Sequence, residues 1–490
     1  MSVVARQSFK YSLVGYLGFL LGTLSTFFLF TNDLSFYGKL RFILPTAQLF
    51  LPIAVFGISY SNVKFFQEMQ KDGKHHNMLS VSLLGIVFNF ILFCICFFCF
   101  YLLFPNYQNS KTWEMKGLIL PLVLVSALSA VFNKYISNYK RIAISNIFEN
   151  LFPKLANIGA FCLFFFLGFS ESWAYLFFFL VFLSALLGYY YYANKLEGIN
   201  FDFSLDYFKE NSRWKPFLDY SFYGFLGNLG SYLALSIDNY MISEHIGFQQ
   251  NGVYSTIYSI ISLVSVPAMG LYSISAPIIN KHFAEGTMAE LNHYHKKTSL
   301  VLFSIGLVLL CCICVGFPYL TFYMPKSGGA IREAQSLVWI IGAATLFELA
   351  TGFNGYIISM SKYYRFSIIV MLVLAMVTIG LNFFFIKFTN LGILGVGIAY
   401  AVSLTLFNIV KIIFNYIKFK VFPLSMPMLY VLIVGGIALG GAFFLPELNI
   451  PFYNLVYKPF VVLIIALLGN HFLKIYPLAD FVFEKLKKKK

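Results

Sequence analysis

The sequence predicts an all-α polytopic membrane protein with about fourteen transmembrane helices, and two observations support this fold class. The chain of 490 residues is 59% hydrophobic and only 11% charged, whereas soluble globular domains carry about 25% charged residues. Apolar runs long enough to cross about 30 Å of hydrocarbon as α-helices recur from one end of the chain to the other. A chain of this length and composition is therefore an integral membrane protein.

The apolar runs form two groups on either side of a polar stretch, residues 194–215. The first group contains the runs 11–30, 41–60, 78–104, 117–137, 143–168 and 173–192. The second group contains the runs 217–242, 252–276, 298–323, 335–358, 366–386, 391–413, 426–446 and 455–473. The first run is longer than the apolar region of a signal peptide, and no cleavage site of small residues follows it, so we expect it to be retained as a helix.

The distribution of basic residues between the loops predicts the membrane topology. With an even number of spans both termini lie on one side, and the loops on that side hold most of the 35 Lys and Arg residues. The positive-inside rule therefore predicts a multi-pass membrane protein with both termini in the cytoplasm. This asymmetry accounts for the net charge of +15, and we expect no nucleic-acid partner.

An internal repeat divides the spans. SLVGYLGFLLG (12–22) matches SFYGFLGNLGS (221–231), and shorter matches keep the same order further along both halves. The repeat predicts two six-helix lobes related by a pseudo-two-fold axis, followed by two C-terminal helices. The expected domains are an N-terminal lobe (1–193), a cytoplasmic linker (194–216), a C-terminal lobe (217–420), and the last two helices with a basic tail (421–490).

Two segments carry a resemblance to a known family, FYGKLRFILPTAQLFLPIAVFGISYSNVKFF (36–66) and SIDNYMISEHIGFQQNGVYSTIYSIISLVSVPAMGLYSISAPIINKHFAEG (236–286). They resemble the polysaccharide-transport branch of the multidrug/oligosaccharidyl-lipid/polysaccharide (MOP) exporter superfamily. The resemblance implies a V-shaped molecule with a central cavity in the bacterial inner (cytoplasmic) membrane. By alternating access, this molecule flips undecaprenyl-diphosphate-linked oligosaccharide, a repeat unit of O-antigen, capsule or exopolysaccharide, from the cytoplasmic to the periplasmic leaflet. Protons or Na⁺ are the expected coupling ions, polysaccharide polymerase machinery is a candidate partner, and we expect a monomer.

Lys154 is the basic residue placed deep inside a predicted span, about 12 Å from its start at 1.5 Å per residue. A charge in a span costs about 2.5–3.5 kcal/mol even on lenient scales, and it indicates a functional site by default. Two interpretations stay open: Lys154 snorkels or pairs with Glu149, or it faces a water-filled cavity and attracts the diphosphate of the substrate. Pro153 cannot donate to the carbonyl of Glu149, which favours a helix that lines a polar path.

Three acidic residues are candidates for gating or ion coupling. The resemblance assigns the family's helix-seven aspartate to Asp238, as a gate, a partner of a cation or a proton acceptor; a structural role that closes the lobes is the alternative. Glu348 is the most deeply placed acid and has no partner nearby in the sequence, so we expect easy protonation; a hydrogen bond to a neighbouring helix is the alternative. Glu149 is the third candidate, next to Lys154.

Further residues flank the spans that build the family's cavity. Three of these residues are basic: Lys10, Arg41 and Lys281. They either line the cavity and attract an anionic headgroup, or they are ordinary topology anchors. Polar residues that could bind sugars, or only pack between helices, are Asn228, Ser231 and Tyr254. Glycines expected to allow close approach of helices are Gly15, Gly18, Gly22, Gly224, Gly227 and Gly230.

Two other functions would leave features in the sequence that differ from those of a flippase. A drug/cation antiporter of the same superfamily usually carries an acid well inside its first helix, whereas residues 11–30 contain none and Asp33 lies at the outer end. A membrane polysaccharide polymerase or ligase generally has a large external loop with basic and His residues, and the external loops here are short. No nucleotide-binding loop, Ser/His/acid set or metal-ligand spacing occurs, and the seven cysteines lie inside apolar runs. We therefore expect no cofactor and no metal, and a transporter rather than an enzyme.

Overall fold

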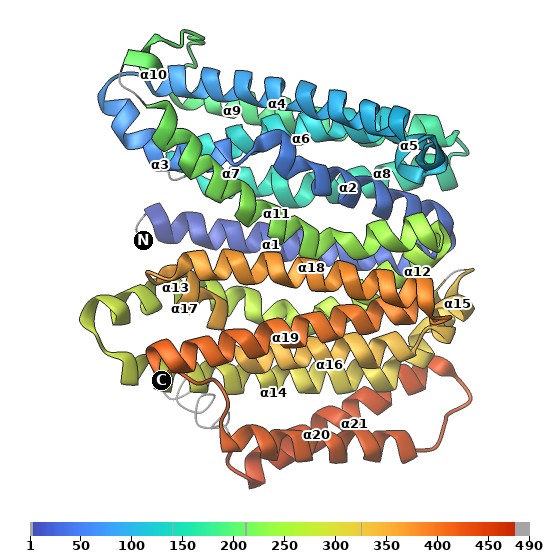
Figure 1. Cartoon of the computed structure of the whole chain (residues 1–490). Helices are drawn as coiled ribbons and strands as arrows, with labels where there is room; N and C mark the ends of the chain where they lie inside the picture. Colours follow the sequence, from blue (N-terminus) through green and yellow to red (C-terminus); the bar gives the residue numbers. More distant parts are fainter. Residues whose placement is uncertain (1–2, 140, 211–212, 325, 476–490) are drawn as a thin grey trace. The chain divides into compact units, whose positions relative to one another are not determined.

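The computed structural model describes residues 3–139, 141–210, 213–324 and 326–475, and all regular secondary structure in these ranges is helical (Figure 1). The chain forms two compact units. Unit 1 consists of residues 1–252 together with 371–379, and unit 2 of residues 253–370 and 380–490. The predicted lobes, linker and C-terminal segment remain a prediction.

The helices of unit 1 follow the first group of apolar runs and the run at 217–242. They are α1 (Val3–Phe28), η1 (Phe30–Asn32), α2 (Leu34–Val55), α3 (Ile58–Lys71), α4 (His75–Leu103), η2 (Pro105–Asn109), α5 (Lys111–Glu114), α6 (Lys116–Asn138), α7 (Ile142–Asn146), η3 (Ile147–Leu151), α8 (Phe152–Phe165), α9 (Glu171–Glu197), α10 (Asp206–Glu210) and α11 (Trp214–His245).

The helices of unit 2 begin in the chain with α12, whose first residues still belong to unit 1, and α18 contributes its middle part to unit 1. They are α12 (Phe248–Ser262), η4 (Leu263–Ser265), α13 (Val266–Glu285), α14 (Met288–Leu320), η5 (Thr321–Tyr323), α15 (Gly328–Glu333), α16 (Ser336–Thr351), α17 (Asn354–Met360), α18 (Tyr364–Phe388), α19 (Ile393–Phe419), α20 (Met426–Phe444) and α21 (Pro451–Phe472).

Each of the fourteen predicted spans coincides with a helix or with consecutive helices, so the predicted all-α polytopic fold is confirmed. Within the described residues, 10 helices are long and apolar enough to cross a membrane, or up to 12 if each of two bent pairs is one span. The two predicted spans outside this set are 143–168, which divides into α7, η3 and α8, and 217–242, which is α11. The first of these two spans contains Lys154, and the second contains Asp238.

The bend between α2 and α3, 47° in size, allows α11 to pack closely against both helices. Phe56 and Gly57 adopt left-handed backbone conformations with φ of 46° and 70°, directly after the last residue of α2 and one turn after Pro52. A Cβ at Gly57 would lie 1.9 Å from the backbone oxygen of Ser221, so only glycine fits there. One turn later, the Ser61 hydroxyl donates to the carbonyl oxygen of Phe217 over 2.9 Å.

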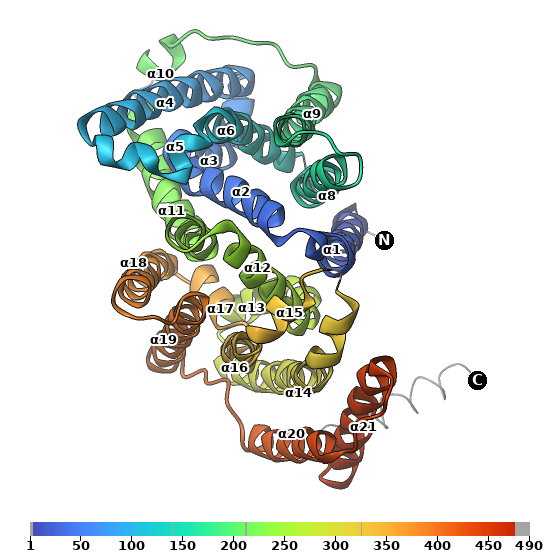
Figure 2. The same cartoon turned by 90° about the vertical axis from the view of Figure 1, so that its right-hand side faces the viewer.

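On another side of unit 1, α8 lies beside α9, as Figure 2 also shows. The helices approach so closely that a Cβ at Gly159 would lie 2.1 Å from the ring of Phe177. This contact fixes α8, the helix that carries Lys154, against the rest of its unit.

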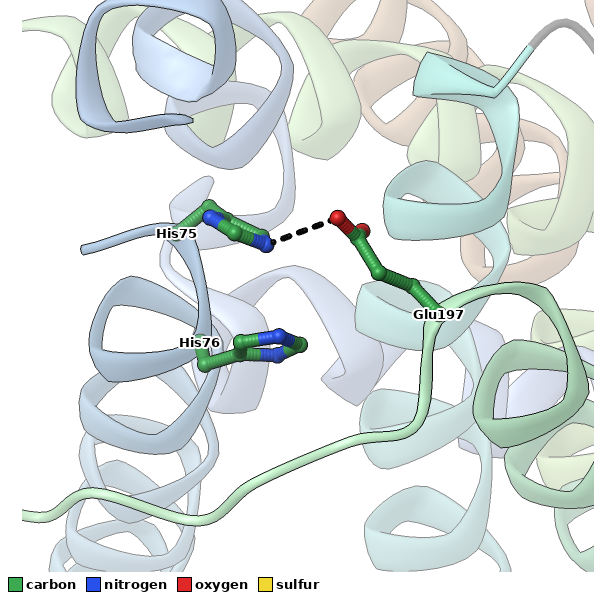
Figure 3. Close-up of side chains that lie close together, drawn as sticks. All are labelled: His75, His76 and Glu197. Atoms are coloured by element: carbon green, nitrogen blue, oxygen red, sulfur yellow. Dashed lines mark ion pairs between the residues drawn. The ribbon is translucent and has the colours of Figure 1, made fainter. Parts of the chain in front are cut away.

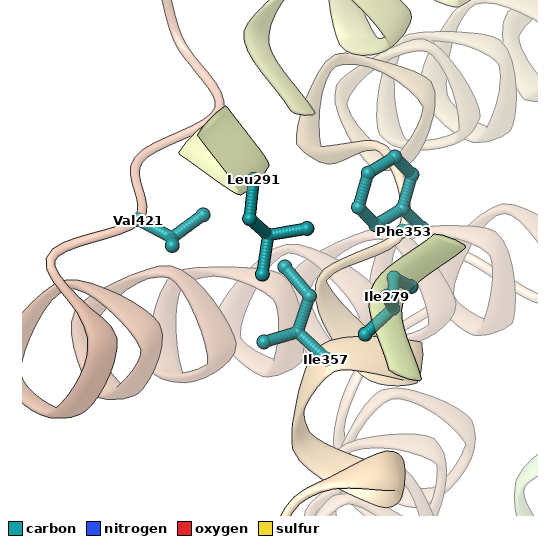
Figure 4. Close-up of a cluster of buried hydrophobic side chains, with 5 residues drawn as sticks. All are labelled: Ile279, Leu291, Phe353, Ile357 and Val421. Atoms are coloured by element: carbon teal, nitrogen blue, oxygen red, sulfur yellow. The ribbon is translucent and has the colours of Figure 1, made fainter. Parts of the chain in front are cut away.

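Unit 2 has a buried cluster where α13, α14, α17 and the segment after α19 meet, and Figure 4 shows its five side chains together. Its members are Ile279, Leu291, Phe353, Ile357 and Val421. In the same unit, α20 and α21 pack against each other and against α14. The last two predicted spans are therefore part of unit 2.

Candidate functional site

The segment around Lys154 is an interrupted helix. A π-helical turn, η3, separates α7 from α8, and Pro153 follows in the first turn of α8. Proline cannot donate a backbone hydrogen bond, and π-helical turns are frequent at functional sites. The Lys154 ammonium donates to the backbone carbonyl of Asn150 over 2.8 Å. The lysine thus finds its acceptor in the irregular turn, one residue beyond the carbonyl that the sequence indicated.

The stem of Lys154 lies on the glycine face of α1. A Cβ at Gly22 would be 3.1 Å from Lys154 Cε, and a Cβ at Gly18 would be 3.5 Å from Lys154 Nζ. At Gly15 nothing lies within 4 Å of the Cβ position. Two of the three glycines expected to bring helices together therefore make room for a charged side chain.

Lys154 has positive charge nearby and no carboxylate. No Asp or Glu among the described residues lies within salt-bridge distance of its ammonium group. Arg41 on α2 is close enough to repel it electrostatically. Glu149, the partner suggested by the sequence, is exposed and accepts instead from Asn133 Nδ2 over 3.3 Å. Lys154 and Arg41 thus form a half-buried pair of cations within unit 1, which we call the dication site.

Two predicted sugar-binding residues lie on α11 in the same unit. Asn228 Oδ1 accepts from the Tyr60 hydroxyl of α3 over 3.1 Å. The Ser231 hydroxyl donates to the carbonyl of Gly227 in its own helix over 2.9 Å. Both side chains therefore have protein partners in this structure.

The other predicted residues are distributed over both units. Asp238 is buried in α11, 6% exposed, and Tyr254 is buried in α12, 2% exposed; both interact with other groups of the protein. Lys281 is exposed at the end of α13, 3.8 Å from Glu285. Lys10 belongs to α1, but its side chain lies outside the described part of the chain.

Glu348 has a partner that the sequence analysis missed. It lies on α16, which packs against α19, and Lys411 on α19 acts on it as an opposite charge. Lys411 is only 9% exposed, and its ammonium lies 4.0 Å from the centre of the Phe407 ring. Lys411 lies two residues before the end of the predicted span 391–413, and the topology count treated it as a cytoplasmic loop residue. A signal was present: Asn408, Lys411 and Asn415 follow helical spacing, and all three are buried.

The chain matches the sequence profile of a family described as "Polysaccharide biosynthesis protein" over residues 4–283. No curated protein matches the chain.

Solved structures share the fold over most of the chain. One, described as "Lipid II flippase MurJ, inward closed conformation", has a TM-score of 0.66 at 15% identity and covers 94% of this chain and 98% of its own. An inward-facing multidrug resistance MATE family transporter of the MOP superfamily has a TM-score of 0.62 at 16% identity and covers 86% and 95%. A MOP superfamily transporter from Pyrococcus furiosus, whose binding pocket is described as having reverse polarity, has a TM-score of 0.57 at 16% identity and covers 85% and 95%.

These three proteins are described as transporters or as a flippase. The family match covers more than half of the chain, from α1 into α13. The chain therefore belongs to the family described as polysaccharide biosynthesis protein, and it shares the fold of solved transporters of the MOP superfamily and of the flippase MurJ.

Proposed function

We propose that the protein is a flippase that moves undecaprenyl-diphosphate-linked oligosaccharide from the cytoplasmic to the periplasmic leaflet of the inner membrane by alternating access. The observation that carries this proposal is the dication site, in which Lys154 lies inside a predicted span beside a second cation and has no carboxylate within salt-bridge distance among the described residues. The family description supports a role in polysaccharide biosynthesis.

A diphosphate suits the dication site for an electrostatic reason. Two like charges in a medium of low dielectric constant repel each other, and each loses hydration. An anion with several oxygens relieves both costs, because hydrogen bonds between ammonium or guanidinium groups and phosphate are short and strong. The single carbonyl that Lys154 contacts leaves further N–H groups of the ammonium for such a ligand.

The lipid tail of this substrate needs an apolar surface. Unit 1 has an apolar groove of about 1220 Å³ lined by residues of α2, α3, α4 and α11, among them Phe50, Phe56, Phe88 and Phe97. A groove of this kind supports a substrate that combines a charged headgroup with a long hydrocarbon chain.

For energy coupling we propose Glu348, with protons or Na⁺ as the driving ion. Its carboxyl group lies opposite Lys411 in the interior of unit 2, so its charge state changes the electrostatic balance between α16 and α19. Asp238 and Glu149 remain further candidates for gating. Lys10, Lys281, Asn228, Ser231 and Tyr254 remain candidates for contacts with the headgroup and the sugars.

The test is transport by the purified protein in liposomes. We expect the protein to move a fluorescent polyprenyl-diphosphate oligosaccharide from one leaflet to the other, measured by loss of accessibility to a membrane-impermeant quencher. A parallel arm measures efflux of an apolar organic cation under a proton gradient. Movement of the cation without movement of the lipid would overturn the proposal in favour of a drug antiporter.

A further inference from the structure

His75, His76 and Glu197 form a cluster that the proposed transport cycle does not use. Both histidines open α4, and Glu197 is the last residue of α9. One potential ligand atom from each residue lies within 4.8 Å of those of the other two. Figure 3 shows the two rings side by side, with Glu197 facing them.

The cluster contains buried ring nitrogens without hydrogen bonds. His75 is 8% exposed, and neither of its ring nitrogens has a hydrogen-bond partner among the described residues; the same holds for His76 Nδ1. His75 Nε2 lies 3.2 Å from a carboxylate oxygen of Glu197, but this contact lacks the geometry of a hydrogen bond. Buried polar atoms without partners are costly, so their presence points to a missing ligand.

The charges around the cluster also favour a bound cation. Glu197 is a carboxylate at the C-terminal end of a helix, where the helix dipole is unfavourable to negative charge. Within the described part of the chain, no Lys or Arg forms a salt bridge with Glu197. Lys74, which precedes His75, instead lies 3.9 Å from Asp202, and Lys195, two residues before Glu197, forms none of the ion pairs of the described chain.

Two imidazoles and a carboxylate are ligands that Zn²⁺ prefers, at distances of about 2.0–2.2 Å. In a tetrahedral site with these distances, ligand atoms are about 3.4 Å apart, which is close to the 3.2 Å between His75 and Glu197. The other two atom pairs, at most 4.8 Å apart, would need to approach by up to about 1.4 Å, a change that rotation of the His76 and Glu197 side chains can supply because neither is buried.

We propose that His75, His76 and Glu197 bind a Zn²⁺ ion, with water as the fourth ligand, which joins the start of α4 to the end of α9. The segment after α9 already contacts α4, because Asn77 Nδ2 donates to the carbonyls of Asp202 and Ser204 over 2.9 and 2.8 Å. The ion would therefore fix the beginning of the connection from α9 to α11, on the side that the basic residues predict to be cytoplasmic.

No metal site was expected from the sequence, because no set of metal ligands lies close together in the chain with a familiar spacing. The adjacent pair His75-His76 was the available signal. Its third member lies far away in sequence, and only the packing of α9 beside the start of α4 brings it near.

The test measures zinc directly, on the full chain purified in detergent with an affinity tag that contains no histidine. We expect one Zn²⁺ per chain by elemental analysis, a visible absorption spectrum of tetrahedral type after Co²⁺ substitution, and a higher Tm with Zn²⁺ than after chelation. The double variant His76→Gln/Glu197→Gln should lose the bound metal and the Tm shift, with an affinity loss of at least the 10–100-fold that even outer-shell changes cause.

The matched control is His282→Gln/Glu290→Gln, which removes the other His–carboxylate contact of the described chain, 3.9 Å long and without a second histidine. This control should keep the full metal content. His76 and Glu197 are not buried, so the test variant is expected to fold, and a monodisperse elution profile checks this. Equal metal content and equal Tm shifts in the wild type and the His76→Gln/Glu197→Gln variant, or no bound Zn²⁺ in either, would overturn the proposal and leave a His75–Glu197 ion pair.

Discussion

Each unit of the protein contains a lysine well inside a helix, and the two lysines differ in what surrounds them. Lys154 in unit 1 is half-buried, bonds to a backbone carbonyl and is repelled by Arg41. Lys411 in unit 2 is almost fully buried, lies over an aromatic ring and opposes the carboxyl group of Glu348. Among the described residues no carboxylate lies within salt-bridge distance of Lys154, whereas Lys411 has the opposing charge of Glu348.

This difference separates two uses of a buried charge. A cation whose charge is balanced by a carboxylate of the same protein stabilises the fold, or changes its environment when that carboxylate binds a proton. It attracts an anionic ligand only weakly. A cation without a carboxylate partner can be stabilised by an external anion. The comparison supports the proposal that Lys154 binds the substrate and that the pair Glu348–Lys411 couples transport to an ion.

The largest expected effect comes from Lys154→Ala. We expect transport of the lipid-linked oligosaccharide to fall about 100-fold, nearly 3 kcal/mol, because charge-assisted hydrogen bonds to the diphosphate are lost. The amount of folded protein should not change, since no buried carboxylate loses its partner.

The matched control for Lys154 is Lys458→Gln, which removes a buried lysine of α21 that lies 5.2 Å from the centre of the Tyr319 ring. Transport by this variant should stay close to that of the wild type, and Lys154→Arg should keep more activity than Lys154→Ala. Full transport by Lys154→Ala would remove the distinction between the two lysines.

A smaller effect is expected from Glu348→Gln. The substitution leaves Lys411 buried without its opposing charge, and we expect a loss of about 2 kcal/mol in unfolding free energy; this is below the 3–5 kcal/mol typical of a broken buried ion pair because the two groups are not in direct contact. The double variant Glu348→Gln/Lys411→Met should recover most of this stability. Denaturant unfolding measures both.

The same variant tests coupling. Transport by Glu348→Gln in liposomes should no longer respond to an imposed pH gradient, while transport without a gradient continues. An unchanged response to the gradient would leave Glu348 and Lys411 with a structural role only.

The smallest effect is expected from the glycines of α1. Gly22→Ala places a methyl group 3.1 Å from Lys154 Cε, so the flexible lysine must move and transport should fall a few-fold without loss of stability. Gly15→Ala meets no atom within 4 Å; it should leave transport unchanged and raise stability by about 0.5–1 kcal/mol, because alanine favours a helix over glycine. Equal transport by the two variants would contradict the contact between Gly22 and Lys154.

The helices could be predicted from the sequence because a membrane span needs a long apolar run, and all fourteen predicted runs coincide with helices. The bend at Phe56–Gly57 was also readable in outline, from Pro52 and Gly57. The π-helical turn at 147–151 was not, because a regular helix and an interrupted one have the same apolar pattern. Only Pro153 pointed to it.

The site could be predicted in part. Lys154 stood out because a charge in a span is rare, but its position on Gly18 and Gly22 depends on how α1 packs against α8. Lys411 was misassigned because counting basic residues for topology treats every lysine near a helix end as a loop residue. The partner of Glu348 and the third member of the histidine cluster are both distant in sequence, and no local pattern reveals such pairs.

The central claim, that Lys154 receives the diphosphate, is tested most directly by binding. The Kd of a polyprenyl diphosphate is measured for the wild type, Lys154→Gln and Lys458→Gln in lipid nanodiscs. The account predicts that Lys154→Gln weakens binding by at least about tenfold and that Lys458→Gln leaves the Kd unchanged. The same Kd for Lys154→Gln and the wild type would contradict it.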